Sequence, residues 1–316
     1  MRKAALLYNP ASGGSKERQK EVEAALAVMQ SGGVEARLVF TNSPAHAGDE
    51  ARQAIAIGCD TIFACGGDGT IHNIVQVLAK SSVALGILPL GTANALAHDL
   101  RLPLSIVEAA RASLKAVPRR IALGRVDYQG AQSTRGTRYF IVAAGVGVDA
   151  HLFYKLHANA KQRIGMAAYY AKAWHLWFTY PMRRFLVEYM ESGATVAQRA
   201  EVTELMSVRI QNFGKVLQEL APGASLERDD MRLVVCRTSS RAAYLAYVTR
   251  GLFRQRWKVP GIDLVSSTNA ICRYVTQEGE QEQRNIYVEA DGELLGTLPA
   301  EISVVPDALT LLIPPW

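Results

Sequence analysis

Short apolar segments alternate with longer segments of helical periodicity over the first third of the chain, and this alternation limits the fold more than any other feature. Strands are predicted at residues 4–8, 36–41, 61–64 and 84–89. Helices are predicted at residues 16–29, 45–57, 71–79, 93–100 and 106–114. Each strand leads into a loop before a helix, which is typical of an α/β domain with a parallel sheet.

The pattern changes after Val117-Pro118, where strand-like runs become dominant. These predicted strands lie at residues 121–128, 139–148, 185–190, 206–211, 233–237, 263–274 and 285–290. Two helical segments rich in aromatic residues interrupt them, at residues 164–180 and 241–257. The sequence therefore predicts a second, β-rich domain that begins near residue 122, without an internal repeat or a long polar linker.

Composition excludes several classes of protein. The 316 residues are 49% hydrophobic and 20% charged, so the chain is neither disordered nor fibrous. No apolar run reaches the roughly 18 residues of a spanning helix, so we expect no transmembrane segment. The four cysteines lack disulfide or metal spacing, which favours the cytoplasm. The net charge of +6 indicates affinity for anions, but we find no motif for nucleic acid.

The most informative motif is Gly66-Gly67-Asp68-Gly69-Thr70, which follows an apolar strand and opens a predicted helix. Glycine lets backbone N–H groups approach an anion closely, and a helix N-terminus adds a partial positive charge. With Thr70 as the expected helix cap, the loop predicts a phosphate site. The alternative is a tight turn that binds nothing, but three glycines with an embedded acid favour the phosphate site.

Two further loops have the same design. Asn9-Pro10-Ala11-Ser12-Gly13-Gly14 follows the first predicted strand, and Pro89-Leu90-Gly91-Thr92-Ala93-Asn94 follows the fourth. Thr92 and Asn94 can offer side-chain hydrogen bonds to a ligand, although each is also a common helix cap. Three such loops at the carboxyl ends of strands match the place where open α/β sheets bind ligands.

These motifs resemble those of the bacterial diacylglycerol kinase-like lipid kinases, which are relatives of sphingosine and ceramide kinases. Besides the three loops, the resemblance rests on Gly145-x-Gly147-x-Asp149-Ala150, Asn212-Phe213-Gly214, Pro222-Gly223-Ala224 and Asp291-Gly292-Glu293 with Pro299 behind it. It implies an ATP-dependent kinase of two domains. Residues 1–122 and 299–316 would form an α/β nucleotide domain similar to phosphofructokinase and NAD kinase, and residues 123–298 a β-sandwich domain for the lipid.

The resemblance also implies the residues that hold ATP and Mg²⁺. The phosphates and the metal would be held by Gly66, Gly67, Asp68, Gly69, Thr70, Thr92 and Asn94. Asn9 and Thr41 would flank the nucleotide, and Asp68 would support the metal. Asp230 matches a further metal position of some relatives, with main-chain carbonyls at Glu227 and Arg232 as helpers. A solvated surface acid is the alternative for Asp230.

An alcohol acceptor benefits from a general base, and the resemblance assigns the base to Asp291-Gly292-Glu293. Asp291 is the first choice and Glu293 the second. The alternative is an exposed Asp-Gly hairpin turn, which these two residues favour on their own.

The sequence departs from the family at two acidic positions, which are Ala95 and Ala122 here. Asp99 or Asp127 can substitute if the fold places either one suitably. If neither does, we expect a different network between the domains or a weakly active enzyme.

Two aromatic segments have alternative interpretations. Residues 166–177 form either a core helix or a wall of an acyl-chain pocket. Residues 241–258 combine aromatic with basic side chains, which suits an anionic bilayer surface or an amphipathic helix packed on the protein.

We therefore expect an ATP- and Mg²⁺-dependent kinase that phosphorylates a hydroxyl of a membrane-derived lipid, with diacylglycerol as the leading acceptor. It would act from the cytoplasm, peripherally at the inner face of the membrane, and a homodimer is compatible with this role. One alternative is an NAD kinase-like phosphotransferase, whose family shares the Gly-Gly-Asp-Gly-Thr loop. The other is a non-catalytic, ATP-responsive binding protein, which Ala95 and Ala122 suggest.

Overall fold

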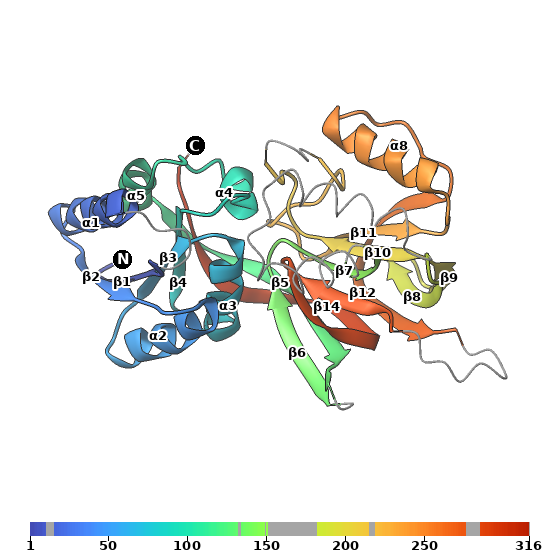
Figure 1. The fold of residues 1–316 in the computed structure, drawn as a ribbon, viewed down its shortest axis with the longest axis horizontal. Coiled ribbons are helices and arrows are strands. Elements are labelled where there is room, and N and C mark those ends of the chain that lie inside the picture. Colours follow the sequence, from blue (N-terminus) through green and yellow to red (C-terminus); the bar gives the residue numbers. More distant parts are fainter. Residues whose placement is uncertain are drawn as a thin grey trace. The chain divides into compact units, whose positions relative to one another are not determined.

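The computed structural model describes residues 1–10, 16–131, 134–148, 150, 182–214, 219–275 and 285–315 (Figure 1). Residues 11–14 of the first loop, Asp149 and the predicted aromatic helix at residues 164–180 lie outside the described residues. The chain forms two compact units. The first contains Met1–Leu123, Asn212–Val216 and Val305–Trp316, and the second contains Gly124–Gln211 and Leu217–Val304.

A parallel sheet forms the centre of the first unit. Its strand order is β2 (Glu35–Phe40), β1 (Lys3–Tyr8), β3 (Thr61–Gly66), β4 (Ala84–Pro89) and the end of β14 (Glu293–Ile313). Every residue of β3 and β4 is buried, as expected for strands covered on both faces. The ends of β1, β3 and β4 lie side by side, so the loops that follow them emerge at one edge of the sheet.

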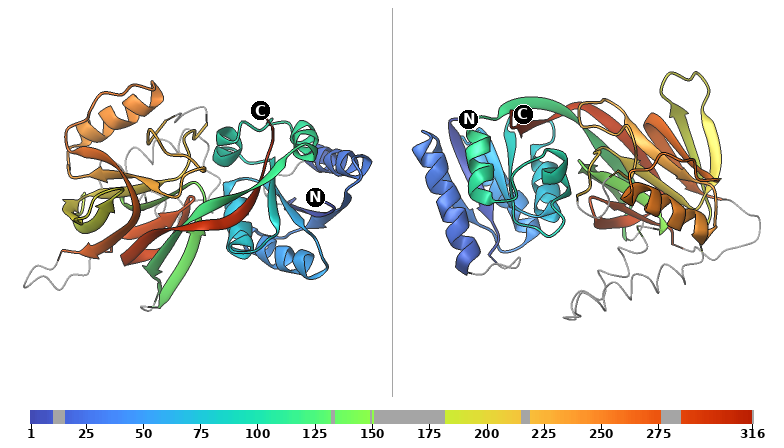
Figure 2. Two further views of the ribbon diagram at one scale, coloured as in Figure 1. Left: turned by 180° about the vertical axis from the view of Figure 1, so that it is seen from behind. Right: turned by 90° about the horizontal axis from the view of Figure 1, so that it is seen from above.

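Helices cover both faces of this sheet. On one face α1 (Lys16–Ser31) packs with α5 (Ile106–Leu114), and on the other α2 (Pro44–Ala56) packs with α3 (Asp68–Leu78), as Figure 1 and, from behind, Figure 2 show. Alternate side chains of β1 share a core with α1 and α5. A short helix, α4 (Ala95–Asp99), follows β4.

The four strands and the helices predicted for this unit are confirmed, and their ends differ by a few residues. Helix α3 begins at Asp68, three residues before its predicted start, because it opens directly at the glycine loop. Helix α4 is shorter than predicted, because Asn94 has a left-handed conformation (φ 49°) that an α-helix cannot contain.

An antiparallel β-sandwich forms the second unit, which confirms the predicted fold class. Its strand order is β14, β13 (Tyr287–Ala290), β7 (Ala143–Gly147), β10 (Glu204–Val208), β11 (Met231–Cys236), β12 (Ile262–Tyr274), β8 (Phe185–Glu191) and β9 (Gln198–Val202). Because β12 also pairs with β14, the strands close around one hydrophobic core. Strands β5 (Val117–Gln129) and β6 (Arg135–Phe140) pair as a hairpin, and helix α8 (Arg241–Leu252) follows β11.

Several elements of the second unit differ from the prediction. The predicted strand at residues 139–148 is two strands, β6 and β7. The sequence did not predict strand β9. This strand lies at the edge of the sheet, and its exposed polar residues, which are usual for an edge strand, hide the apolar pattern of a strand. Strand β14 was missed because Gly296, Pro299 and Pro306 interrupt it. Helix α8 ends at Leu252, five residues before its predicted end, and the chain returns to the first unit at Val305.

Candidate active site

The glycine loop after β3 passes directly into α3. Gly67 is the N-cap of the helix, and its carbonyl accepts hydrogen bonds from the N–H groups of Thr70 (3.0 Å) and Ile71 (3.2 Å). The prediction of Thr70 as the cap is therefore wrong, since Thr70 lies within the first turn and is buried. The first N–H groups of a helix have no partner inside the helix, and here they belong to the glycine loop. The geometry suits an anion at this point.

Gly67 and Gly91 bring this loop into contact with the loop after β4. A Cβ atom on Gly91 would lie 2.4 Å from the Cα of Gly67, and one on Gly67 would lie 3.0 Å from the Cα of Gly91. The N–H of Leu90 also donates to the carbonyl of Gly66 (3.0 Å). Residues 66–70 and 91–94 therefore form one continuous backbone surface, which we call the paired loops. Gly91 in particular has no room for a side chain.

Asn94 holds the second of the paired loops in shape. Its side-chain oxygen accepts a hydrogen bond from the N–H of Gly91, and its side-chain amide donates to the Gly91 carbonyl, both at 2.8 Å. Its own carbonyl accepts a hydrogen bond from the N–H of His98 (3.0 Å), which lies in the last turn of α4. Thr92, in contrast, is exposed. We infer that Asn94 positions the loop and that Thr92 can contact a ligand directly.

The ends of β1 and β2 contain buried polar groups. Asn9 and Thr41 are both buried, and the N–H of Thr41 donates to the carbonyl of Tyr8 (2.8 Å). The Thr41 Oγ1 and the Tyr8 hydroxyl are buried without a hydrogen-bond partner within the part of the chain that is described. Burial raises the pKa of Tyr8, so this phenol remains a donor at neutral pH. A buried hydroxyl without a partner is costly, which indicates a ligand that supplies one.

Tyr8 was not among the predicted site residues. The sequence places it as the last residue of an apolar strand, and its hydroxyl gives no local signal of function. The half-exposed ring of Phe40 lies beside it, with ring centroids 6.3 Å apart. Only the pairing of β1 with β2 shows that these two rings and Thr41 are neighbours.

Asp68 is the first residue of α3 and is half-buried beside the paired loops. It is the acid best placed to join a metal bound to nucleotide phosphates, since Mg²⁺ often takes one or two protein carboxylates and completes its shell with phosphates and water. Across the described ranges, no group of three or more His, Cys, Asp or Glu side chains is arranged to hold a metal ion.

Asp99 and Asp127, the two acids that could replace the acidic residues missing at Ala95 and Ala122, each have a partner within the protein. Asp99 accepts a hydrogen bond from the N–H of Asn212 (2.9 Å), at the start of the Asn-Phe-Gly motif. Asp127 forms an ion pair (2.8 Å) with the arginine two residues before it. Ala95 and Ala122 are themselves buried. These contacts give Asp99 and Asp127 roles in holding the backbone and the β5–β6 hairpin.

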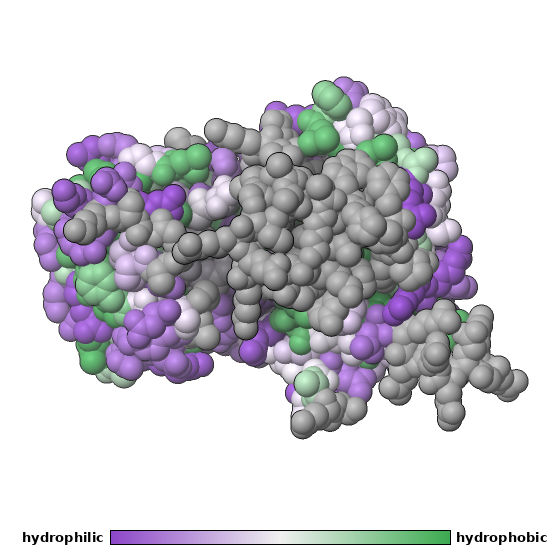
Figure 3. Space-filling model, in the orientation of Figure 1, coloured by the Kyte–Doolittle hydropathy of each residue, from purple (hydrophilic) through white to green (hydrophobic). Residues whose placement is uncertain are grey.

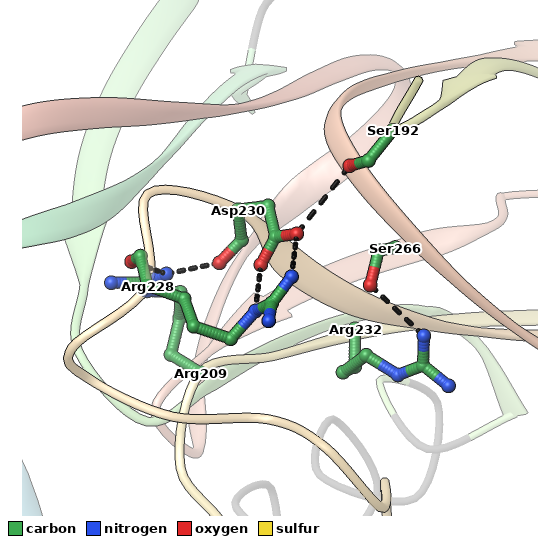
Figure 4. Close-up of polar contacts among 6 residues, drawn as sticks. All are labelled: Ser192, Arg209, Arg228, Asp230, Arg232 and Ser266. Atoms are coloured by element: carbon green, nitrogen blue, oxygen red, sulfur yellow. Dashed lines mark hydrogen bonds and ion pairs between the residues drawn. The ribbon is translucent and has the colours of Figure 1, made fainter. Parts of the chain in front are cut away.

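Arginines surround Asp230, the second expected metal ligand (Figure 4). Its carboxylate forms an ion pair with Arg228, with 2.6 Å between Arg228 Nε and Asp230 Oδ1, and accepts a hydrogen bond from Ser192 (3.4 Å). The hydrogen bond from Arg228 lowers the pKa of Asp230. The guanidinium of Arg209 donates to the main-chain carbonyls of Arg228 (2.8 Å) and Asp230.

Arg209 supplies the cation at this position. Its side chain is fully buried, and burial lowers its pKa to about 10, which leaves it charged at neutral pH. A carboxylate and main-chain carbonyls are the ligands of a hard divalent cation. Here two guanidinium groups bind the Asp230 carboxylate and the carbonyls of Arg228 and Asp230, which are not the carbonyls of Glu227 and Arg232 that the sequence analysis named. The residues at Asp230 therefore do not fit a metal ion, and we assign none there.

The Asp291-Gly292 pair forms the hairpin turn between β13 and β14. Both residues have positive φ, 50° and 82°, as a two-residue hairpin loop requires. The Asp291 carboxylate also accepts hydrogen bonds from the N–H groups of Ile141 (3.1 Å), Val142 (2.9 Å) and Ala143 (3.1 Å). Asp291 thus ties the turn to the start of β7.

Glu293 is the first residue of β14, directly after this turn, and it is half-buried. The buried Glu289 accepts a hydrogen bond from the N–H of Gly292 (2.8 Å) and so supports the turn from the other side. Both acids that the sequence analysis named for the base thus lie at one turn, and both oxygens of Asp291 hold backbone N–H groups.

Comparisons with known proteins agree with this architecture. The family described as diacylglycerol kinase catalytic domain matches residues 3–126, and the YegS C-terminal NAD kinase beta sandwich-like domain matches residues 141–313. A diacylglycerol kinase of Bacillus subtilis is 29% identical over 304 residues, which cover 95% of this chain and 93% of the relative. A solved diacylglycerol kinase from Bacillus anthracis is similar with a TM-score of 0.71 at 18% identity, covering 99% of this chain and 97% of that one. Yeast NADH kinase shares the fold with a TM-score of 0.51 at 11% identity, covering 98% and 83% of the two chains.

An α/β unit with phosphate-type loops and an antiparallel β-sandwich is thus the architecture of a kinase class that includes NAD kinases and diacylglycerol kinases. Within this class, the chain belongs to the bacterial diacylglycerol kinase-like family of lipid kinases. No helix in the described ranges is both long and apolar enough to span a membrane.

We predict that Gly91→Ala impairs the nucleotide site, because its Cβ would overlap the Cα of Gly67 and push the paired loops apart. A displacement of this kind can cost on the order of 100-fold in rate, and we expect weaker ATP binding in calorimetry. Gly48→Ala is the matched control, since its Cβ meets neighbours only at 3.5 Å inside α2. Equal ATP affinity of Gly91→Ala and wild type would contradict the role of this contact.

We also predict that Arg209→Gln lowers the free energy of unfolding by about 1–3 kcal/mol for each of the two main-chain carbonyls that lose their buried donor. The exposed Arg199→Gln is the control and should change it by less than about 0.5 kcal/mol. Urea denaturation with and without EDTA measures both effects. If Arg209→Gln unfolds at the wild-type midpoint and EDTA lowers that midpoint, a divalent cation rather than Arg209 stabilises the fold.

Proposed function

We propose that the protein transfers the γ-phosphoryl group of ATP to a hydroxyl of a membrane-derived lipid, with diacylglycerol as the acceptor. The observation that carries this proposal is the contact of Gly67 with Gly91, which joins two loops into one backbone surface at the N-terminus of α3. Relatives that match nearly the whole chain are named diacylglycerol kinases, which supports the acceptor.

The first unit would bind the nucleotide. Backbone N–H groups of residues 67–69 and the hydroxyl of Thr92 would hold the phosphates, because a helix N-terminus favours negative charge. Asn9, Thr41 and Tyr8 would supply hydrogen bonds to the rest of the nucleotide from the ends of β1 and β2. Asp68 would hold Mg²⁺ together with the phosphates. The metal, when bound, neutralises phosphate charge, and phosphoryl transfer depends mainly on such neutralisation and on positioning.

The second unit would supply the base. Glu293 would accept the proton of the lipid hydroxyl, and Asp291 would act as a positioning residue that fixes the turn before Glu293. The enzyme would work from the cytoplasm at the inner face of the membrane, as a peripheral protein, and a homodimer is compatible with this role.

A direct assay tests the reaction and its alternatives. Labelled phosphate from ATP, with Mg²⁺, is offered separately to a lipid extract and to NAD, and the labelled product is identified. We expect labelled phosphatidic acid. Labelled NADP would make the protein an NAD kinase-like enzyme. ATP binding without any transfer would support the non-catalytic alternative, which the buried Ala95 and Ala122 motivate.

We predict that Glu293→Gln lowers kcat by about 10²- to 10⁴-fold while ATP affinity is retained, because loss of a general base affects the chemical step. Glu301→Gln, an exposed position on the same strand, is the control. Asp291→Asn should mainly lower stability, since it weakens three backbone hydrogen bonds. A stable, fully folded Asp291→Asn with the larger loss of kcat would instead make Asp291 the base.

A further inference from the structure

Helix α8 buries its polar aromatic side chains and exposes its aliphatic ones. The Tyr247 hydroxyl donates to the carbonyl of Leu220 (2.6 Å), and the Tyr244 hydroxyl lies 2.8 Å from the Thr203 hydroxyl. Both tyrosines are buried, and so is Arg250, whose guanidinium lies 4.3 Å from the Tyr247 ring centroid. These contacts hold the helix on the sandwich. An ordinary surface helix has the opposite polarity, with its apolar face toward the core.

The outward face of α8 is apolar and continues past the end of the helix. Leu245, Val248 and Leu252 follow one another at helical spacing of three and four residues. Phe253 and Trp257 extend the apolar face and are 68% and 45% exposed. We call these five residues the α8 surface. Figure 3 shows hydrophobic atoms at the upper right, where Figure 1 places α8.

In the sequence around the α8 surface, every charged residue is basic. Between Asp230 and Asp263 there is no Asp or Glu. Basic residues in this interval are Arg232, Arg237, Arg241, Arg250, Arg254, Arg256 and Lys258. Arg254, Arg256 and Lys258 are exposed and alternate with or follow Phe253 and Trp257. Large apolar side chains thus alternate with cations along this part of the sequence, and an acid from elsewhere, Glu219, lines a pocket together with Arg250 and Arg256.

We propose that the α8 surface inserts into an anionic lipid bilayer and holds the second unit at the membrane. This inference rests on the proposed function, since a lipid acceptor lies in a bilayer, and it names the part of the chain that reaches the bilayer. Aliphatic side chains with Phe enter the acyl boundary, Trp prefers the interface, and Arg and Lys bind acidic headgroups. The observations match each of these three requirements.

A second copy of the chain fits this surface less well. A two-fold dimer would place the same patch against itself, and the arginines and Lys258 of the two copies would repel one another. A bilayer with acidic headgroups has the complementary charge. The charge border therefore favours lipid as the occupant.

Sedimentation with lipid vesicles, without ATP, tests the proposal on the full chain. Vesicles of phosphatidylcholine with phosphatidylserine should bind the wild type more tightly than vesicles of phosphatidylcholine alone. Phe253→Ser/Trp257→Ser should weaken binding by at least about tenfold, because two interfacial anchors are lost. Arg254→Gln/Lys258→Gln should weaken it by about fivefold per residue with phosphatidylserine present, and by less without it.

Matched controls come from another part of the same unit. Val196→Ser removes an apolar side chain that is 69% exposed, and Arg199→Gln removes an exposed cation, both in or beside the β8–β9 hairpin. Neither should change vesicle binding. The proposal is overturned if the wild type does not bind anionic vesicles, or if the α8 variants bind as it does. It is also overturned if those variants turn a dimer into a monomer and leave vesicle binding unchanged.

A separate assay distinguishes this inference from the proposed function. Phosphate transfer to a short-chain diacylglycerol in detergent micelles does not require a bilayer, so the α8 variants should retain it. If the wild type binds vesicles through α8 but transfers no phosphate, the result contradicts the proposed function and supports the membrane role of the α8 surface. If phosphate transfer is seen and the α8 variants still bind vesicles as the wild type does, the result contradicts only the membrane role of the α8 surface.

Discussion

The contact between Gly67 and Gly91 is the constraint on which the proposed nucleotide site depends. Two neighbouring parallel strands, β3 and β4, end at the same edge of the sheet, and their loops can merge only if no side chain stands between them. The merged loops place backbone N–H groups where a helix begins, and they need no charged side chain to attract phosphate. Asn94 and Gly66 then act as supports of this surface, through hydrogen bonds and close packing.

At Asp230, where the sequence predicted a metal ion, arginine side chains of the second unit supply the positive charge. Arg209 and Arg228 bind the carbonyls and the carboxylate at Asp230, and Asp291 binds three backbone N–H groups beside the Asp-Gly turn. A charged group that is already saturated by protein partners is poorly suited to bind a metal or accept a proton. We therefore keep Asp68 and Glu293 only as the proposed metal ligand and the proposed base.

Helix α8 has polar side chains on its buried face and aliphatic side chains on its exposed face. Its tyrosines and Arg250 face the sandwich, where hydrogen bonds to Leu220 and Thr203 satisfy them. The aliphatic residues are then left on the outside. In water this arrangement costs free energy, whereas at a bilayer the same side chains would be buried.

The sequence by itself determined the order of strands and helices in the first unit, the position of the three loops and the two-part architecture. These features depend on local periodicity and on glycine, which act over a few residues. The tertiary structure alone decided which acids are engaged, because their partners are distant in sequence: Asp291 and Ile141 are 150 residues apart. The same holds for the pairing of β1 with β2, which brings Tyr8, Phe40 and Thr41 together. Strand β14 was not predicted for a related reason. Glycine and proline interrupt its sequence, and its strand conformation depends on pairing with β13, β12 and β4.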